Sequence, residues 1–277
     1  MSIMGTLIVA TDYSKEAENA VEYACAAAQY LKSDVVLFNS YMIPAHISNA
    51  RLPPSIFNEL LEKNTSLLRN RASELSQKYG ISVGYESGFL QLNEKLEQLF
   101  SKYSASMVVI GTAADSLGQD LFGNTGTTTI LKLNYPVLAV PMGVSFKPIR
   151  KILFACDVLR GVNIRILEEV RAFALGMGAE VELFHVRERM KELTDTETIN
   201  NNAVQIGQGL EGVSHTYKPV ESNAVIDGIK DEIRQMDADL LIMVPQRYGF
   251  WKSIVHASKT RIMASQSEIP ILSIRIN

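Results

Sequence analysis

The chain of 277 residues is 47% hydrophobic and 21% charged, and its formal net charge at pH 7 is -3. This length and composition favour about two globular domains with full apolar cores. The small negative charge argues against nonspecific binding to nucleic acid or to an anionic membrane as the main function. The N-terminus lacks the basic start of a signal peptide, and no apolar run approaches the roughly 18 residues of a membrane span, so we expect a cytoplasmic protein.

Apolar runs alternate with helical patterns through the first half of the chain. Strands are expected at residues 7–10, 35–38, 81–86, 108–112 and 136–141, and helices after Ser14 and over 56–79 and 92–103. Ser14 followed by Glu16 and Glu18 is typical of a capped helix start. Because the central strands are apolar on both faces, they indicate a parallel sheet that is covered by helices.

A polar, glycine-containing loop follows the expected strand at 108–112 and leads into a helical run that reaches Leu131. Gly123 would let a ligand approach the backbone closely, because glycine has no Cβ. Asn124, Thr125 and the free N–H groups of the helix could then hold phosphate oxygens at the positive end of the helix dipole. Asn and Thr are equally ordinary helix caps, so the loop either binds an anion or simply connects the strand to the helix.

The second half of the chain repeats the first after a linker at 142–150. The matched segments are 151–157 with 7–12, 179–186 with 33–40, 238–244 with 105–111, and 269–274 with 135–140. Four blocks in the same order at nearly constant spacing indicate a duplicated βαβ-type domain. We therefore predict domains at 1–145 and 146–277, the second shorter by a helix turn or two in its middle.

Other chemical motifs are sparse. Cys25 and Cys156 lie far apart in apolar surroundings and are expected to be buried free thiols. The histidines show no metal-binding spacing, and the chain contains neither a GxSxG motif nor a Walker lysine motif. We therefore expect no zinc site and no rapid nucleotide hydrolysis.

Each half of the sequence resembles a universal stress protein (UspA-type) domain, and the whole resembles a tandem universal stress protein. The resemblance rests on a first strand ending at Thr11 and Asp12, on Gly111 after the fourth strand, and on the closing Pro-Val-Leu-Ala-Val-Pro at 136–141. It implies two doubly wound α/β domains, each with a Rossmann-like five-stranded parallel sheet of strand order 3-2-1-4-5. In such sheets ligands bind beyond the carboxyl ends of strands one and four, where the winding reverses.

The nucleotide motif of the family is kept only in part. ATP-binding members carry G-x2-G-x9-G-(S/T) after strand four; here Gly111 fits, Ala114 replaces the second glycine, and Gly123 arrives one residue early. By resemblance, the candidate site comprises Ala10, Thr11, Asp12, Ser40, Gly111, Thr112, Ala114, Gly123, Asn124 and Thr125. Asp12 either contacts the ligand or caps the helix that follows it.

The corresponding loop of the second half has lost this motif. Pro245 follows the strand, and no glycine precedes the helix. We expect no nucleotide there, and we expect the aromatic residues Tyr248, Phe250 and Trp251 to fill the crevice or cover an interface. The donors of this loop either form a different anion site or a solvated basic loop; they are Arg247, Lys252, Ser253 and His256.

The resemblance implies a stress-response protein that binds ATP or a similar adenine nucleotide in its N-terminal domain, with Mg²⁺ bridging the phosphates. The alternative is a tandem protein that binds no nucleotide and acts as an interaction scaffold. Enzymatic activity, at most slow ATP hydrolysis, has only the analogy of the fold in its favour. The stress signal and the protein partners are not encoded in any recognisable motif.

The final strands of the two halves are apolar edges. Residues 137–140 carry no charge, and residues 271–274 meet their first charge at Arg275. Unprotected edge strands invite pairing, so we predict that these two strands pair and join the halves as a pseudo-symmetric dimer. Whether the tandem chain forms a further homodimer stays open.

Overall fold

The computed structural model describes residues 5–40, 54–88, 92–112, 135–156, 162–187, 196–221, 225–244 and 268–274. The elements of the first half are β1 (Thr6–Ala10), α1 (Lys15–Leu31), β2 (Val35–Ser40), α3 (Pro54–Tyr79), β3 (Val83–Gly88), α4 (Leu92–Tyr103), β4 (Ala105–Thr112) and β5 (Val137–Pro141). Those of the second half are β6 (Lys151–Ala155), α6 (Ile164–Met177), β7 (Glu180–Arg187), α7 (Thr196–Gly209), β8 (His215–Glu221), α8 (Val225–Met236), β9 (Leu240–Met243) and β10 (Ile271–Ser273).

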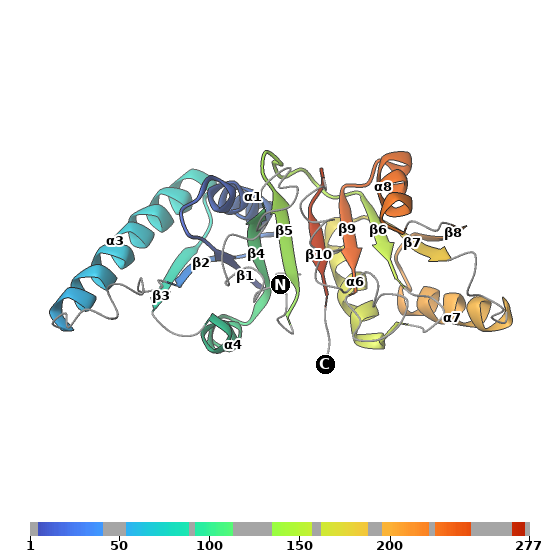
Figure 1. Cartoon of the computed structure of the whole chain (residues 1–277), viewed down its shortest axis with the longest axis horizontal. Coiled ribbons are helices and arrows are strands. Elements are labelled where there is room, and N and C mark those ends of the chain that lie inside the picture. The colour runs from blue at the N-terminus through green and yellow to red at the C-terminus, as the bar shows by residue number, and fades with distance from the viewer. Residues whose placement is uncertain are drawn as a thin grey trace.

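The described strands form one ten-stranded sheet in the order β3-β2-β1-β4-β5-β10-β9-β6-β7-β8. The order 3-2-1-4-5 predicted for the first half is confirmed, and the second half repeats it in reverse across the molecule. Neighbouring strands are parallel within each half, whereas β5 and β10 pair antiparallel, with Leu138 opposite Leu272. The predicted pairing of the two final strands is therefore confirmed, and α3 and α7 lie at opposite ends of the molecule (Figure 1).

The second half is shortened more than the sequence comparison suggested. α3 has 26 residues and α7 has 14. At about 3.6 residues per turn, the difference is roughly three turns rather than one or two. The expectation was wrong because the sequence offset gives only the total number of residues missing between two strands. It does not show that nearly all of them are missing from the helix.

Local sequence explains where α1 begins and ends. The Ser14 side chain accepts a hydrogen bond from the backbone N–H of Ala17 at 3.2 Å, as expected for a helix cap. At the other end Lys32 adopts a left-handed conformation (φ 55°), and its N–H donates a hydrogen bond to the Ala28 carbonyl.

Both cysteines are free and buried as predicted, and burial raises the pKa of the Cys25 thiol to about 12.

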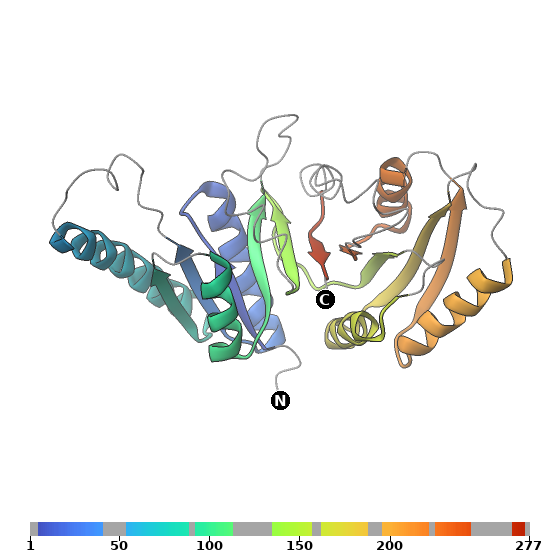
Figure 2. The ribbon, with the colours of Figure 1, turned by 60° about the horizontal axis from the view of Figure 1, so that its bottom comes forward.

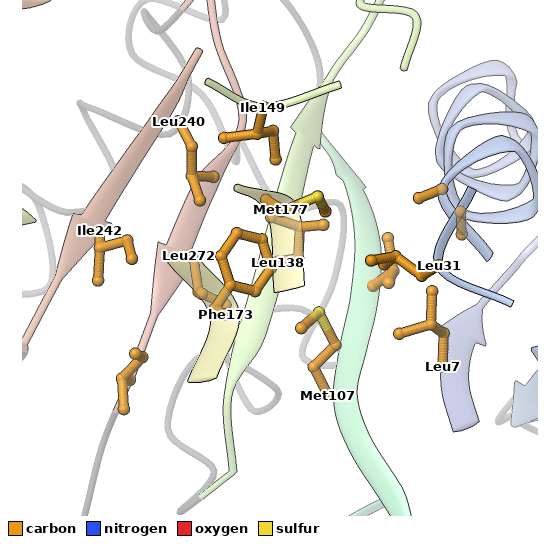
Figure 3. Packing of buried hydrophobic residues seen from close by; sticks show 14 of the residues in the cluster. Leu7, Leu31, Met107, Leu138, Ile149, Phe173, Met177, Leu240, Ile242 and Leu272 are labelled. Carbon is orange, nitrogen blue, oxygen red and sulfur yellow. The ribbon is translucent and has the colours of Figure 1, made fainter. Parts of the chain in front are cut away.

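Two apolar cores lie on the two faces of the sheet. The described residues of α1, α3, α6 and α7 pack on one face, and those of α4 and α8 pack on the other (Figure 2). Each core contains residues from both halves. In the first, Phe173 and Met177 of α6 lie close to Leu138 and Leu272 at the centre of the molecule (Figure 3). The halves therefore share their hydrophobic interior.

The connecting segment 142–150 is part of this packing. The Phe146 ring meets the Tyr23 ring edge-on, with 5.4 Å between centroids, and Ile149 is buried. The Lys147 ammonium lies 2.8 Å from Asp239 Oδ1. Burial alone would raise the pKa of Asp239, but the Lys147 ammonium and two backbone N–H groups outweigh burial and lower it. The segment thus docks against both halves as well as joining them.

In each half, ion pairs connect the outermost strand to a neighbouring helix. The strand carries the negative charge in the first half and the positive charge in the second. On β3, Glu86 lies 3.4 Å from Lys95 and 2.5 Å from Lys102, both on α4. On β8, Lys218 lies 2.6 Å from Glu232 on α8. The contact between strand and helix is kept in both halves although the signs of the charges are exchanged.

Glu182 on β7 adds a second carboxyl group beside this last pair. Burial raises the pKa of Glu182, and the Glu232 carboxylate raises it further, whereas the Lys218 ammonium lowers it. The fold therefore favours protonated Glu182. Protonated Glu182 contributes to stability fully when the pH is below the pKa that Glu182 has in the unfolded chain. The contribution is lost as the pH rises through the raised pKa of Glu182 in the folded chain.

We expect Glu182→Gln, which mimics the protonated carboxyl, to unfold at higher denaturant concentration than the wild type at about pH 8 and at the same concentration at about pH 4. Urea denaturation across this range measures the difference. Glu211→Gln, at an exposed position of the second half that is not among the charges that shift the pKa of Glu182, is the control and should follow the wild type at every pH. A constant offset between Glu182→Gln and the wild type at all pH values would contradict the prediction.

Candidate functional site

The predicted site lies at the carboxyl edge of the first-half strands. β1 is hydrogen-bonded to β2 on one side and to β4 on the other, with Ala10 opposite Phe38 and Val9 opposite Val109. The ends of the three strands therefore bring together the described part of the predicted set, which is Ala10, Thr11, Asp12, Ser40, Gly111 and Thr112. Outside the described residues lie Ala114, Gly123, Asn124 and Thr125, and in the second half Pro245, Arg247, Tyr248, Phe250, Trp251, Lys252, Ser253 and His256.

Asp12 takes part in the turn between β1 and α1. Its Oδ1 accepts a hydrogen bond from the Ser14 N–H at 3.0 Å, immediately before Ser14 caps the helix. The residue is exposed, and Oδ1 is the oxygen used in this turn. Asp12 therefore has a structural role, in which Oδ1 holds the turn before α1. A carboxylate has acceptor positions for a further partner on its other oxygen.

Gly111 is required by packing. A Cβ at this position would lie 2.0 Å from the Glu16 carbonyl oxygen and 2.7 Å from the Ala17 nitrogen. The first turn of α1 therefore rests directly on the β4 backbone, and no side chain fits between them. The sequence identified the glycine, but its physical cause is the approach of helix and strand.

Thr11 is held on both sides by groups that the sequence prediction missed. Its N–H donates to the Phe38 carbonyl at 2.9 Å, and its carbonyl accepts from Asn39 Nδ2 at 2.6 Å. Asn64 Nδ2 on α3 donates to Asn39 Oδ1 at 2.8 Å, and the Tyr13 hydroxyl donates to Asn64 Oδ1 at 3.0 Å. The three side chains of Asn39, Asn64 and Tyr13 fix the turn after β1 to β2 and α3. Only Asn39 left a signal in the sequence, as a polar residue within an apolar strand.

Thr112 is buried at the end of β4, on the opposite side of β1 from β2. It is 2% exposed, and its carbonyl accepts from the Met142 N–H at 2.8 Å. Asn19 on α1 donates to the Pro141 carbonyl at 3.1 Å and accepts from the Gly143 N–H at 3.3 Å. The end of β4 is therefore tied to the start of the connecting segment.

The second half reproduces the inner part of this frame. The Cys156 N–H donates to the Phe184 carbonyl at 3.1 Å, and His185 Nδ1 lies 3.3 Å from the Cys156 carbonyl oxygen. Because a carbonyl can only accept, Nδ1 carries the proton in this contact. Cys156 and His185 thus take the places of Thr11 and Asn39.

The strand ends of the second half differ from those of the first at two points. Val244 stands where the first half has Gly111, and its side chain is buried. The connection from β6 to α6 has eight residues, 156–163, against four, 11–14, from β1 to α1. A valine side chain does not allow the close helix approach that Gly111 permits, and the connection from β6 to α6 is four residues longer than that from β1 to α1.

The described residues contain no group of three or more His, Cys, Asp or Glu side chains that could hold a metal ion. In the same ranges, no helix combines the length and the apolar composition that crossing a membrane requires.

The family comparison concerns the first half of the chain. Residues 4–141 match the sequence model of the "Universal stress protein family". A search of curated protein sequences found no match.

Solved structures agree over the whole chain. A universal stress protein from Archaeoglobus fulgidus DSM 4304 matches 100% of this chain and 100% of its own length at 16% identity, with a TM-score of 0.73. A putative universal stress protein from Pseudomonas aeruginosa UCBPP-PA14 matches 98% of this chain and 93% of its own at 13% identity and a TM-score of 0.55. A universal stress protein solved in complex with cAMP matches 47% of this chain and 100% of its own at 10% identity and a TM-score of 0.36. At these identities the first two matches establish the fold.

Proposed function

Because residues 4–141 belong to the universal stress protein family, we propose that the chain is a tandem universal stress protein of the cytoplasm whose N-terminal domain binds an adenine nucleotide. In this proposal the domains are 1–145 and 146–277. The observation that carries it is the frame at the ends of β1, β2 and β4, which presents Asp12 at the point where the winding of the sheet reverses.

The residues of the crevice suit the two ends of a nucleotide. The exposed carboxylate of Asp12 can accept hydrogen bonds from hydroxyl groups of a ribose, and Ser40 lies at the end of the adjacent strand. Gly123, Asn124 and Thr125 would hold the phosphates through backbone N–H groups and a hydroxyl. Mg²⁺, when bound, would neutralise phosphate charge. Thr11, Gly111 and Thr112 are buried or packed, so their role is to fix the floor of the crevice.

The second domain, in this proposal, keeps the fold and has no nucleotide site. Its frame at Cys156 and His185 supports the same strand ends, but Val244 and Pro245 replace the glycine-containing exit from the strand. Its role is to pair with the first domain through β10.

The competing function is a scaffold that binds proteins and no nucleotide. It would be favoured if the loop at 113–134 does not form a phosphate cradle, because Ala114 and the displaced Gly123 depart from the family motif. Mass spectrometry of gently purified protein tests for nucleotide that remains bound and separates the two proposals directly.

We expect isothermal titration calorimetry to show binding of ATP, ADP or AMP by the wild type, and no measurable heat with Gly123→Val, because a branched side chain blocks the approach of phosphate. Gly249→Val, at a glycine in the second-half loop, is the matched control and should bind like the wild type. Titrations with and without Mg²⁺ measure the contribution of the metal ion. Absence of binding by the wild type at millimolar nucleotide would favour the scaffold.

A further inference from the structure

We propose that two copies of this chain associate through β3, so that the sheets of the two molecules join edge to edge. The surface is the outer backbone edge of Val83–Gly88, and the partner is a second copy of the same chain. The inference concerns assembly and does not depend on nucleotide binding.

β3 and β8 are the two ends of the ten-stranded sheet, and each pairs with one neighbour among the described strands. They lie at opposite ends of the molecule (Figure 1). An end strand has a row of backbone N–H and C=O groups along its outer side, to which a further strand can bind. The pairing of β5 with β10 shows that this chain already joins two such edges at its centre.

The hydrogen bonds of β3 show which of its residues face outward. In a parallel pair, alternate residues of a strand turn both backbone groups to the same neighbour. The Val35 N–H donates to the Ser82 carbonyl at 3.0 Å, so residues 82, 84, 86 and 88 face β2. The outward N–H and C=O groups therefore belong to Val83, Tyr85 and Ser87.

The other end of the sheet is blocked by a proline. The Val181 N–H donates to the Ser214 carbonyl at 2.9 Å, so residues 214, 216, 218 and 220 face β7. Pro219 is therefore an outward residue of β8. Proline has no N–H to donate, and its presence on an edge strand hinders pairing with a further strand.

Ser87 is the counterpart of Pro219 in the first half. Asn39 of β2 lies beside Ser87, and His185 of β7, which takes the place of Asn39, lies beside Pro219. The two halves thus differ at the same outward position: the second half has a residue that blocks pairing, and the first half has an N–H that permits it.

The open edge is complementary to itself. When two β3 strands pair antiparallel about a two-fold axis at Tyr85, the Tyr85 residues of the two copies lie opposite each other. Val83 of each copy then lies opposite Ser87 of the other. All three pairs consist of outward residues, and such a pair exchanges two backbone hydrogen bonds. Because β8 is blocked, the association closes at two chains.

The charge on β3 does not oppose this pairing. Glu86 is the one charged residue of the strand, and its carboxylate is held by Lys95 and Lys102 of its own chain. In the proposed register Glu86 lies opposite Gly84 of the second copy. No like charges of the two strands therefore meet across the axis.

The test is the assembly state of the full-length protein. Analytical ultracentrifugation over a range of concentrations should show the wild type in equilibrium between one chain and two. Ser87→Pro places the proline of β8 at the equivalent position of β3, so each copy lacks one N–H of the joined edge. We expect the dissociation constant of the dimer to rise about 10- to 100-fold.

Ser87→Ala is the matched control. It removes the hydroxyl that lies 2.7 Å from Thr65 Oγ1 but keeps the backbone N–H, so it should dimerise like the wild type. Pro219→Ser gives an independent test if Ser87→Pro does not fold, as judged by circular dichroism. It opens β8, so chains can add at both ends, and we expect species larger than two chains.

Wild-type protein that remains a single chain up to about 1 mM would overturn the inference. Equal dissociation constants for the wild type and a folded Ser87→Pro would also overturn it, because the contact would then lie elsewhere. Pro219→Ser that forms nothing larger than the wild-type species would contradict the blocking of β8 on which the inference depends.

Discussion

Gly111→Ala should destabilise the chain by at least ~3 kcal/mol, because the new methyl group would meet backbone rather than a movable side chain. The Cβ position lies 2.0 Å from the Glu16 carbonyl oxygen, well inside van der Waals contact. Relief requires α1 to move away from β4. That movement would break the contacts of Asn19 with the start of the connecting segment. The free energy of unfolding from chemical denaturation measures the loss.

Gly84→Ala is the control for this experiment. Gly84 also lies in a strand, but its Cβ would meet Val36 Cγ2 at 3.4 Å, an ordinary contact with a side chain. We expect a change of less than ~1 kcal/mol there. Similar stabilities of the two variants would mean that α1 does not rest on β4 as described.

Leu272→Ala should lower the free energy of unfolding by ~2–5 kcal/mol, the range for truncating a buried leucine. Leu272 is 2% exposed and pairs with Leu138 across the boundary between the halves. The cavity would open beneath Phe173 and Met177, so both halves would lose contacts (Figure 3). Differential scanning calorimetry should show a single transition at lower temperature.

Leu175→Ala provides the comparison, since Leu175 lies on the same helix as Phe173 and is 45% exposed. It should change the free energy of unfolding by less than ~0.5 kcal/mol. Two separate calorimetric transitions in wild-type protein, of which Leu272→Ala shifted only one, would contradict a shared interior.

The fold could be predicted from the sequence to the extent that local patterns encode it. The apolar character of residues 137–140 and 271–274 revealed two unprotected edges, and the repeated order of segments supplied their partner. β5 and β10 pair as expected. The length of α7 and the docking of Phe146 against Tyr23 were not predictable, because both depend on contacts between segments distant in sequence.

The positions of the candidate site residues could be predicted in part for the same reason. Thr11 and Asp12 could be located because strand ends are visible in the sequence, and the strand order then brings them beside Gly111. Asn64 could not be found, since one asparagine in a 26-residue helix carries no indication that it reaches β2. Its importance follows only from the three-dimensional position of α3.

The antiparallel pairing of β5 with β10 also determines the direction in which each half presents its ligand edge. Every strand of the first half is parallel to β5, and the described strands of the second half are parallel to β10. The carboxyl ends of the two sets therefore point to opposite rims of the continuous sheet. A small ligand seated at Asp12 cannot touch the corresponding end of β6, and a partner that recognised both rims would have to reach around the sheet. Communication between the two rims would have to travel through the paired backbones at Leu138 and Leu272 and the side chains packed on them.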